Sequence, residues 1–409
     1  MNHRKNILKS YQAGVAAVSG YSAVRKYLPM MLRDEQVHPK QKIRLISIGK
    51  AADAMLQAAL ECLVGQVDSA LLITKTGHAS RRLQNHPLVQ YIESAHPIPD
   101  QSSLRAGQHL VDFCTLHKPS TIDVFLISGG TSSLVELLPE SWTLQEFQSL
   151  TQWMLKNSLS IEQMNMIRGR ISKLKQGQLW QFIKAQEIIG LMISDVPTND
   201  CAVIGSGLLF AGKNKNLPKA LPEHWRKKIP AYKNISINHF SYAIIADNQQ
   251  ALQAVAKKAV ALGYLVIVRS EFLQGDSIEV AKYCCDLSQQ YRHQLLIWGA
   301  ETTVKLPEKI GRGGRCQHLA LAAALYLQDN KSGETILLAG ATDGGDGSST
   351  DSGAMIDRQS ISRMQHKGVD AKQGLNQANS GYCLEASGDV VSTGLTGTNV
   401  MDIVIAFSA

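Results

Sequence analysis

Five short runs of the sequence combine glycine with basic, acidic or hydroxyl side chains, the residue types that bind phosphate and carboxylate groups. They occupy positions 49–51, 128–133, 311–318, 342–347 and 393–399. Glycine lets a backbone come close to an anion, and hydroxyl groups add hydrogen-bond donors. A glycine- and serine-rich helix cap has a similar composition, so each run has a structural interpretation beside the functional one.

Lys50 lies between a predicted strand, Leu45–Ile48, and a predicted helix. A helix N-terminus favours an anion, and a lysine ammonium adds a full positive charge. The run is not a Walker A loop, because Arg44 stands at the position of its first glycine and Ala51 replaces the hydroxyl residue that binds magnesium. Lys50 is therefore either an anion ligand or a surface lysine at a helix start.

Arg315 ends a glycine-rich run that opens the predicted helix Leu319–Leu327. An arginine in a glycine turn at a helix N-terminus suits a polyphosphate. The run lacks the last glycine of the dinucleotide fingerprint, with Cys316 in its place, which argues against NAD. His318 has no partner histidine at metal-ligand spacing, so we expect a packed or surface side chain.

Three carboxylates stand beside predicted strands. Asp195 directly follows Ile189–Ile193, and Asp343 and Asp346 lie in a glycine turn after Thr335–Leu338. Such carboxylates could accept a hydroxyl proton or hold Mg²⁺. The alternatives are a helix cap for Asp195 and a solvated turn for the other two.

Asn165 and Arg168 are three residues apart on a predicted helix, hence on one face, and suit an oxyanion ligand. An exposed arginine with no ligand is the alternative. Taken together, basic anchors, anion-binding loops and carboxylates at the ends of strands and helices are the groups that phosphoryl transfer needs.

Short apolar runs alternating with helical patterns predict an α/β fold. Beyond the strands already mentioned, we expect strands at Ala70–Thr74, Asp123–Ile127, Tyr242–Ala246, Tyr264–Val268, Leu295–Trp298 and Asp402–Phe407. Ligands of open α/β sheets bind outside the carboxyl ends of the strands, where the runs described above lie.

The chain is expected to form two domains. Ile7 to Val18 have helical spacing, and the Pro- and Lys-rich stretch around 213–232 is the best linker candidate. We predict a larger Rossmann-like three-layer α/β/α domain over 1–235 and a smaller α/β domain over 236–409, with an exchange of elements left open. The strand–helix–strand pattern 242–268 then follows the linker.

Composition excludes several classes. The 409 residues are 44% hydrophobic and 19% charged, with a mean hydropathy of −0.09. These values exclude a disordered chain, and no apolar run is long enough for a membrane helix. Seven cysteines without a Cys-x-x-Cys pair favour the reducing cytoplasm. The net charge of +8 favours anionic partners, and no nucleic-acid-binding signature accompanies it.

These runs, in this order, resemble the glycerate 2-kinases that carry a C-terminal MOFRL domain, some of which are labelled hydroxypyruvate reductase. The matching stretches span almost the whole chain: Gly49–Ala52, His96–Asp100, Ser128–Ser132, Asn165–Arg168, Ser194–Pro197, Gly205–Gly207, Glu301–Thr302, Gly313–Gln317, Thr342–Gly347 and Thr396–Val400. The resemblance implies two α/β domains with the active site in the cleft between them. It also implies transfer of the ATP γ-phosphoryl to the 2-hydroxyl of D-glycerate, with Mg²⁺, giving 2-phosphoglycerate.

The resemblance also implies roles for individual residues. The implied catalytic residues are Lys50, Asp195, Arg315 and Asp343. Those implied to bind the acceptor are Ser128, Gly129, Gly130, Ser132, Asn165 and Arg168. Those implied to bind the nucleotide are Lys50, Glu301, Gly313, Gly314, Arg315, Gln317, Thr398 and Asn399. Asp343 and Asp346 are the implied metal ligands. The partners would be ATP and a small hydroxy acid, with no nucleic acid or membrane, and a homodimer is left open.

The sequence departs from the family pattern around these residues. Ala300, Cys316 and His318 replace the usual Gly, Asn and Glu, Thr198-Asn199 replaces Gly-Asp, and Leu208 and Leu395 replace common prolines. Changes next to the charged anchors can alter the acceptor or reduce activity. An NAD(P)H-dependent hydroxypyruvate reductase and a non-catalytic binding relative therefore remain alternatives.

Overall fold

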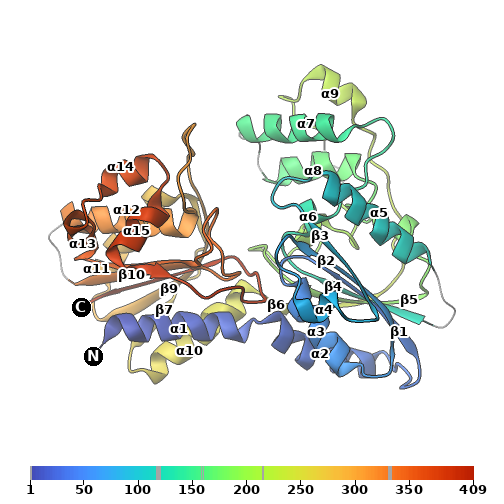
Figure 1. Cartoon of the computed structure of the whole chain (residues 1–409), viewed down its shortest axis with the longest axis horizontal. Coiled ribbons are helices and arrows are strands. Elements are labelled where there is room, and N and C mark those ends of the chain that lie inside the picture. Colours follow the sequence, from blue (N-terminus) through green and yellow to red (C-terminus); the bar gives the residue numbers. More distant parts are fainter. Residues whose placement is uncertain (1, 117–120, 158, 160, 214–215, 330–333) are drawn as a thin grey trace. The chain divides into compact units, whose positions relative to one another are not determined.

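The computed structural model describes residues 2–116, 121–157, 159, 161–213, 216–329 and 334–409. Contacts divide the chain into two compact units (Figure 1). Residues Gly20–Ile245 form the six-stranded unit, and Met1–Ser19 together with Ala246–Ala409 form the seven-stranded unit. The N-terminal segment thus folds with the C-terminal half of the chain.

The six-stranded unit is built on a sheet with the strand order β3-β2-β1-β4-β5-β6. The strands are β1 Lys42–Ile48, β2 Val67–Lys75, β3 Val89–Ser94, β4 Thr121–Ile127, β5 Glu187–Ile193 and β6 Ser241–Ala246. Neighbours from β3 to β5 run parallel. This is the strand order of doubly wound nucleotide-binding folds, and the predicted Rossmann-like architecture is confirmed.

Helices cover both faces of this sheet, which is why its strands are continuous apolar runs. Helices α2 and α3 lie on one face and α5 and α6 on the other (Figure 1). The helices of the unit are α2 Gly20–Asp34, α3 Ala52–Cys62, α4 Arg81–Gln84, α5 Gln101–Thr115, α6 Thr131–Leu134, α7 Leu144–Lys156, α8 Ile161–Ile171, α9 Glu223–Lys228 and the 3₁₀ turns Gln178–Gln181 and Ile204–Ser206. The charge of Arg44 within β1 is met by Asp123 at the paired position of β4, through hydrogen bonds of 2.7 and 2.6 Å between buried side chains.

Helices α7, α8 and α9 add a further layer with its own apolar core. Trp142, Phe147, Met154, Ile167 and Ile171 are among the buried members of this core. The layer holds α8, the helix that carries Asn165 and Arg168, against the segment after β4. The helical insertion therefore positions two of the expected substrate residues.

The seven-stranded unit contains a mixed sheet in the order β12-β11-β10-β13-β9-β7, with β8 also paired to β9. Its strands are β7 Leu265–Val268, β8 Leu273–Asp276, β9 Gln294–Thr303, β10 Thr335–Ala341, β11 Gly353–Asp357, β12 Val390–Val391 and β13 Asp402–Ser408. The pairs β9–β13, β13–β10, β10–β11 and β11–β12 are antiparallel, and β7 and β8 run parallel to β9.

Helices α1 and α10 cover one face of this sheet, and α11 and α12 the other (Figure 1). The helices are α1 His3–Ala17, α10 Asn248–Ala261, α11 Ser277–Gln290, α12 Arg315–Asp329, α13 Ser360–His366, α14 Ala371–Asn376 and α15 Ser380–Ser387. Buried Tyr11 of α1 donates a 2.7 Å hydrogen bond to the carbonyl of Ala341. Gly14 packs so closely on α10 that an added Cβ would lie 2.4 Å from Val255 Cγ2.

The structure places the boundary between the units later than the predicted 235/236. Strand β6 pairs in the six-stranded sheet, so the unit boundary falls after Ile245. The predicted strand–helix–strand unit is consequently wrong, because β6 and β7 belong to different sheets. The linker prediction is also wrong for its described residues: Leu221 and Ile229 join the core of the helical layer. Lys215, part of that basic stretch, lies outside the described residues.

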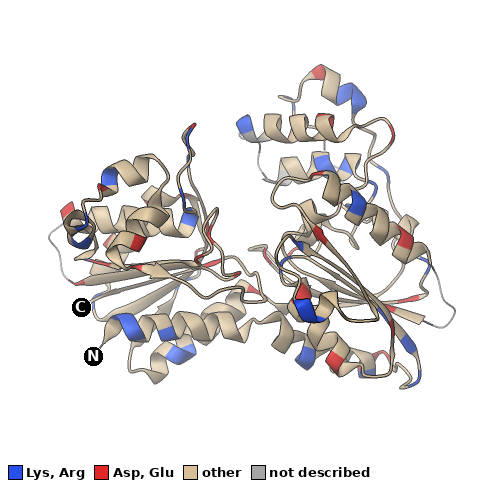
Figure 2. Ribbon diagram, in the orientation of Figure 1, with Lys and Arg blue, Asp and Glu red and all other residues tan. Residues whose placement is uncertain are grey.

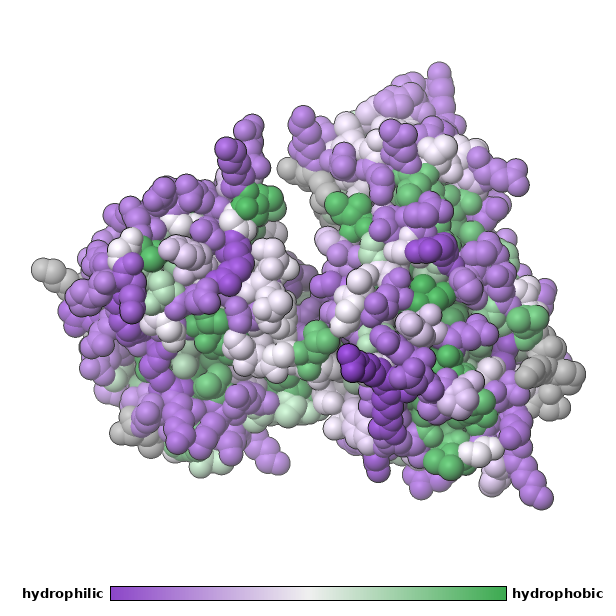
Figure 3. Space-filling model, in the orientation of Figure 1, coloured by the Kyte–Doolittle hydropathy of each residue, from purple (hydrophilic) through white to green (hydrophobic). Residues whose placement is uncertain are grey.

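Charged residues lie mainly on helices, loops and the ends of strands, and the middles of the strands carry few of them (Figure 2). The face drawn in Figure 3 is mostly hydrophilic, with separate apolar groups. Among the described residues, no helix combines the length and apolar character that crossing a membrane requires. All seven cysteines are free thiols.

Candidate active site

Lys50 lies beside the Ser128–Gly130 loop, at the point where the strand order of the parallel sheet reverses. The Lys50 N–H donates to the Gly129 carbonyl at 2.9 Å, and the Ala51 N–H donates to Ser128 Oγ at 3.1 Å. Strands β1 and β4 are neighbours here, but their connections leave in opposite directions along the sheet. Such a switch point is where doubly wound folds bind their ligands.

Two glycines make this close approach of the loops possible. Gly49 has φ +130°, and an added Cβ would lie 2.1 Å from Ser128 Oγ. Gly130 has φ +88°, and a Cβ there would lie 3.1 Å from Lys50 Cγ and 3.2 Å from His96 Cδ2. The side chains of Lys50 and His96 therefore flank Gly130 closely, at a position that a larger residue would crowd.

The hydroxyl groups of the 128–133 loop have divided roles. Ser128 and Thr131 are fully buried, and the Thr131 hydroxyl bonds the Ile48 and Ser128 carbonyls at 3.1 and 2.7 Å. Ser132 is half-buried, and its hydroxyl lies 2.6 Å from that of Ser206. Ser128 thus joins the loops, and Ser132 is the better placed of the two for a substrate.

Helix α8 brings Arg168 and Asn165 to this loop. Arg168 Nη2 donates to the Ser132 carbonyl at 2.9 Å. Two buried atoms on the same helix, Asn165 Oδ1 and Arg168 Nε, have no hydrogen-bond partner among the described residues. Buried polar groups are nearly always paired, so an unpaired acceptor and donor one helical turn apart fit a polar ligand.

A buried ion pair acts electrostatically on the charge of Arg168. Glu136 and Lys175 are fully buried and paired with each other. Burial lowers the pKa of Lys175 to about 8, while the Glu136 carboxylate opposes that shift. Burial also lowers the pKa of Arg168, again against the attraction of Glu136. One carboxylate therefore balances two buried cations.

Asp195 follows β5, which pairs in parallel with β4. The carboxyl ends of parallel strands meet at one edge of a sheet, so Asp195 lies at the same edge as Lys50 and the 128–133 loop. Asp195 is half-buried.

In the seven-stranded unit, Arg315 begins α12 and is held by two carboxylates. Its Nε and Nη2 donate to Asp402 at 2.6 and 3.1 Å, and its Nη1 donates to Glu301 at 3.2 Å. Asp402 is 1% exposed, and the Arg315 side chain is 34% exposed. The Asp402 carboxylate raises the pKa of Arg315 above its ordinary value. The two hydrogen bonds to Asp402 fix the direction of the Arg315 guanidinium, and part of that guanidinium stays accessible to solvent.

Asp346 caps the helix that Arg315 begins. Its Oδ1 accepts from Cys316 N–H at 3.1 Å, and its Oδ2 accepts from Gln317 N–H at 2.7 Å. Burial raises the pKa of this carboxyl group to about 7, although the two N–H groups oppose the shift. Asp346 therefore occupies the anion position predicted for a phosphate at the start of α12, and both of its oxygens are already engaged.

The other expected metal ligand, Asp343, is half-buried in the same glycine turn, and its Oδ1 accepts from Gly345 N–H at 3.2 Å. Among the described residues, no three acidic, histidine or cysteine side chains form a metal-binding group. Mg²⁺ in kinases is bound by one or two carboxylates together with substrate phosphates. Asp343 fits that limited role, and the cap geometry of Asp346 does not.

The three glycine loops of this unit pack on one another. A Cβ on Gly314 would lie 2.3 Å from Asp346, and one on Gly344 would lie 2.0 Å from the Gly394 carbonyl. Gln317 and Thr398 are buried, and each has a side-chain oxygen without a partner among the described residues. The loops predicted to bind the nucleotide are thus brought together.

His318 is packed, as expected: it is buried, and its Nδ1 lies 3.1 Å from Ser380 Oγ. Its burial lowers the pKa of the imidazole. The remaining predicted nucleotide residues, Gly313 and Asn399, lie in the same glycine loops, half-buried and buried respectively.

Several residues of these clusters were not among the predicted site residues, among them Asp402, His96, Ser206 and the buried pair Glu136 and Lys175. Asp402 is a lone acid opening a buried strand, a signal that could have marked it. His96 and Ser206 lie in stretches that carry the family resemblance, but a histidine and a serine at these positions did not by themselves indicate a role in the site. Their neighbours in space, Gly130 and Ser132, are far away in sequence.

The strand order and glycine loops define a two-unit α/β protein of the kind that binds phosphate-bearing ligands. Residues 6–223 match the family described as a domain of unknown function (DUF4147), and residues 294–402 match the MOFRL family. The first match covers more than half of the 409 residues. Together the two matches show that the chain belongs to the glycerate kinase family, whose members combine a DUF4147 domain with a MOFRL domain.

Named relatives extend over nearly the full length. A glycerate 2-kinase from Pyrococcus horikoshii is 28% identical over 99% of this chain and 97% of its own. A D-glycerate 2-kinase from Thermotoga maritima is 27% identical, over 98% and 97%. The crystal structure of Thermotoga maritima glycerate kinase superposes with a TM-score of 0.82, at 26% identity, covering 99% of both chains.

Proposed function

We propose that this chain is an ATP-dependent glycerate 2-kinase, transferring the γ-phosphoryl group of ATP to the 2-hydroxyl of D-glycerate to give 2-phosphoglycerate and ADP. The observation that carries the proposal is the cluster at the β1–β4 switch point. There Lys50 flanks Gly130, and α8 presents Asn165 Oδ1 and Arg168 Nε, which have no hydrogen-bond partner within the described part of the chain. The full-length similarity to glycerate 2-kinases supports it.

The acceptor is held by α8 and the neighbouring loop. Arg168 donates to the glycerate carboxylate, and Asn165 Oδ1 accepts from a hydroxyl group. Burial makes such a charge–charge interaction stronger than it is in water. Asp195, at the same sheet edge, accepts the proton of the 2-hydroxyl as the new bond to phosphorus forms.

The basic residues neutralise charge on the phosphates. In the six-stranded unit, Lys50 would neutralise charge on the transferred phosphoryl group. In the seven-stranded unit, Arg315 is fixed by Asp402 and keeps part of its guanidinium accessible, as a ligand of nucleotide phosphates would. Mg²⁺ bound with ATP supplies additional positive charge there, and Asp343 is the side chain that would hold it.

The seven free cysteines support a reducing compartment, the cytoplasm.

The test is ³¹P NMR of the product formed from ATP, Mg²⁺ and D-glycerate. We expect ADP and one phosphomonoester whose phosphorus couples to the C2 proton. Oxidation of NAD(P)H by hydroxypyruvate without phosphoryl transfer would instead establish the reductase alternative. Thermal stabilisation by ATP or glycerate with no turnover would establish a non-catalytic relative.

A further inference from the structure

A basic pocket lies in the six-stranded unit, outside the residues assigned to the reaction. It has a volume of about 70 Å³, enough for several water molecules, and is lined by parts of four segments. The lining residues are Pro139, Gly169, Arg170, Ile171, Lys173, Gln176, Gln178, Pro230, Ala231, Tyr232 and Lys233. None of the residues proposed to bind glycerate or ATP lines it.

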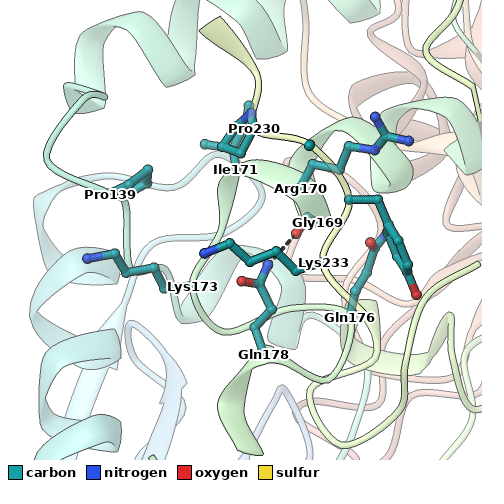
Figure 4. Close-up of a pocket in the computed structure, with 11 residues that line it drawn as sticks. Pro139, Gly169, Arg170, Ile171, Lys173, Gln176, Gln178, Pro230 and Lys233 are labelled. Carbon is teal, nitrogen blue, oxygen red and sulfur yellow. Dashed lines mark hydrogen bonds between the residues drawn. The ribbon is translucent and has the colours of Figure 1, made fainter. Parts of the chain in front are cut away.

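The charge of the pocket is one-sided. Arg170, Lys173 and Lys233 are cationic, and none of the described lining residues is acidic. In Figure 4 the side chains of Lys173 and Lys233 extend towards the same side of the pocket, and the Arg170 guanidinium extends towards the other side. Like charges around one concavity repel each other, and an anion between them removes that repulsion.

Two neutral side chains of the lining donate to backbone carbonyl oxygens. Gln178 Nε2 donates to the Gly169 carbonyl at 2.9 Å, which covers a carbonyl oxygen at the C-terminal end of α8 that would otherwise repel an anion (Figure 4). The Tyr232 hydroxyl donates to the Gly212 carbonyl at 2.6 Å and so fixes the wall carrying Lys233. Arg170 is half-buried, and this burial lowers the pKa of its guanidinium.

We propose that this pocket binds a small phosphate-bearing anion through Lys173 and Lys233, at a site separate from the reaction. Inorganic phosphate and phosphorylated hydroxy acids share the required chemistry. The pocket also touches the proposed substrate helix: Gln176 lines the pocket, and its Nε2 donates to the Asn165 carbonyl at 3.3 Å. If the proposed function holds, an occupant should therefore change the KM for glycerate.

The test is isothermal titration calorimetry of the full chain with inorganic phosphate, and separately with 2-phosphoglycerate. All variants carry Lys50→Ala, which removes binding at the reaction site. They are Lys50→Ala alone, Lys50→Ala with Lys173→Ala/Lys233→Ala (the alanine pair), and Lys50→Ala with the charge-preserving Lys173→Arg/Lys233→Arg (the arginine variant). Lys257→Ala/Lys258→Ala, on exposed positions of α10, is the control.

We expect phosphate binding that survives in Lys50→Ala, in the arginine variant and in the control, and that weakens at least 10-fold in the alanine pair. Tighter binding of 2-phosphoglycerate than of phosphate would identify a phosphorylated acid as the ligand, and equal binding would identify phosphate alone. Absence of binding to Lys50→Ala, or unchanged binding by the alanine pair, would overturn the proposal. These measurements do not depend on turnover, so they remain decisive whether or not the kinase assignment is correct.

Discussion

The guanidinium of Arg315 donates to both carboxylate oxygens of Asp402, at 2.6 Å from Nε and 3.1 Å from Nη2. Asp402 is almost completely buried at the start of β13. A bidentate pair of this kind fixes both the position and the direction of the guanidinium. Arg315 is thus oriented before any ligand arrives, and Asp402 is its positioning residue.

We expect Asp402→Asn to impair catalysis through Arg315. The amide retains one acceptor but loses the charge-assisted fork, so kcat should fall about 10- to 100-fold, since one misdirected charge-stabilising group costs up to about 10³. The free energy of unfolding should drop by about 1–3 kcal/mol, because a buried partner is lost. Steady-state kinetics and urea unfolding measure the two effects. Glu301→Gln should show a smaller loss, because the Glu301 side chain is 41% exposed. Equal losses would contradict the role of Asp402.

Removal of the Lys50 ammonium tests the switch-point site. Lys50→Ala should lower kcat by about 10²–10³, in the range found for loss of one preorganised charge-stabilising donor. The fold should be preserved, because the substitution keeps the backbone N–H that donates to the Gly129 carbonyl. Lys40→Ala, an exposed lysine of the same unit, is the matched control. Near-normal turnover by Lys50→Ala would remove Lys50 from the mechanism.

Gly49 and Gly65 form a matched pair for the glycine requirement. Both have positive φ, +130° and +80°, but an added Cβ meets Ser128 Oγ at 2.1 Å only at Gly49. Gly65→Ala should cost about 1–2 kcal/mol from its backbone conformation alone. Gly49→Ala should cost clearly more, because the Ser128 loop must also move. Denaturant unfolding compares the two, and equal costs would show that the loops are not tightly packed.

The raised pKa of Asp346 predicts a pH-dependent stability. Because the folded-state pKa, about 7, exceeds the ordinary value of 3.8, the folded protein binds the proton more tightly than the unfolded chain does. The contribution of this group is therefore full below about pH 3.8 and lost as the pH rises through 7. The stability difference between the wild type and Asp346→Asn should shrink or reverse from pH 5 to pH 7 and level off by pH 8. A difference that does not vary with pH would show that the carboxyl is ionised throughout.

Replacing Gly14 of α1 by alanine should destabilise the protein, although the same change usually stabilises a helix. Replacing glycine by alanine within a helix normally stabilises by up to about 1 kcal/mol. At Gly14 the new Cβ would lie 2.4 Å from Val255 Cγ2, so α1 and α10 must separate. Gly14→Ala should therefore lower the melting temperature, whereas Gln12→Ala, exposed on the same helix, should not. A higher melting temperature for Gly14→Ala would contradict the observed packing.

Most strands were recognisable in the sequence because they are buried on both faces. The predicted strands Leu45–Ile48, Asp123–Ile127 and Ile189–Ile193 all lie within observed strands. Strand β3 was missed, because its exposed and half-buried residues break the apolar run. Burial on both faces leaves a continuous apolar run in the sequence, and the polar exposed positions of β3 interrupt it.

The sequence by itself determined the local features of the site: glycine turns at strand ends, the spacing of Asn165 and Arg168, and the family to which these runs belong. Only the tertiary structure decided which partners meet. It paired Arg315 with Asp402, used Asp346 to cap α12, kept β6 in the six-stranded sheet and joined α1 to the seven-stranded unit. The reason is physical, since local patterns set φ, ψ and burial within one element, whereas register and packing between distant segments select the partner of each buried polar group.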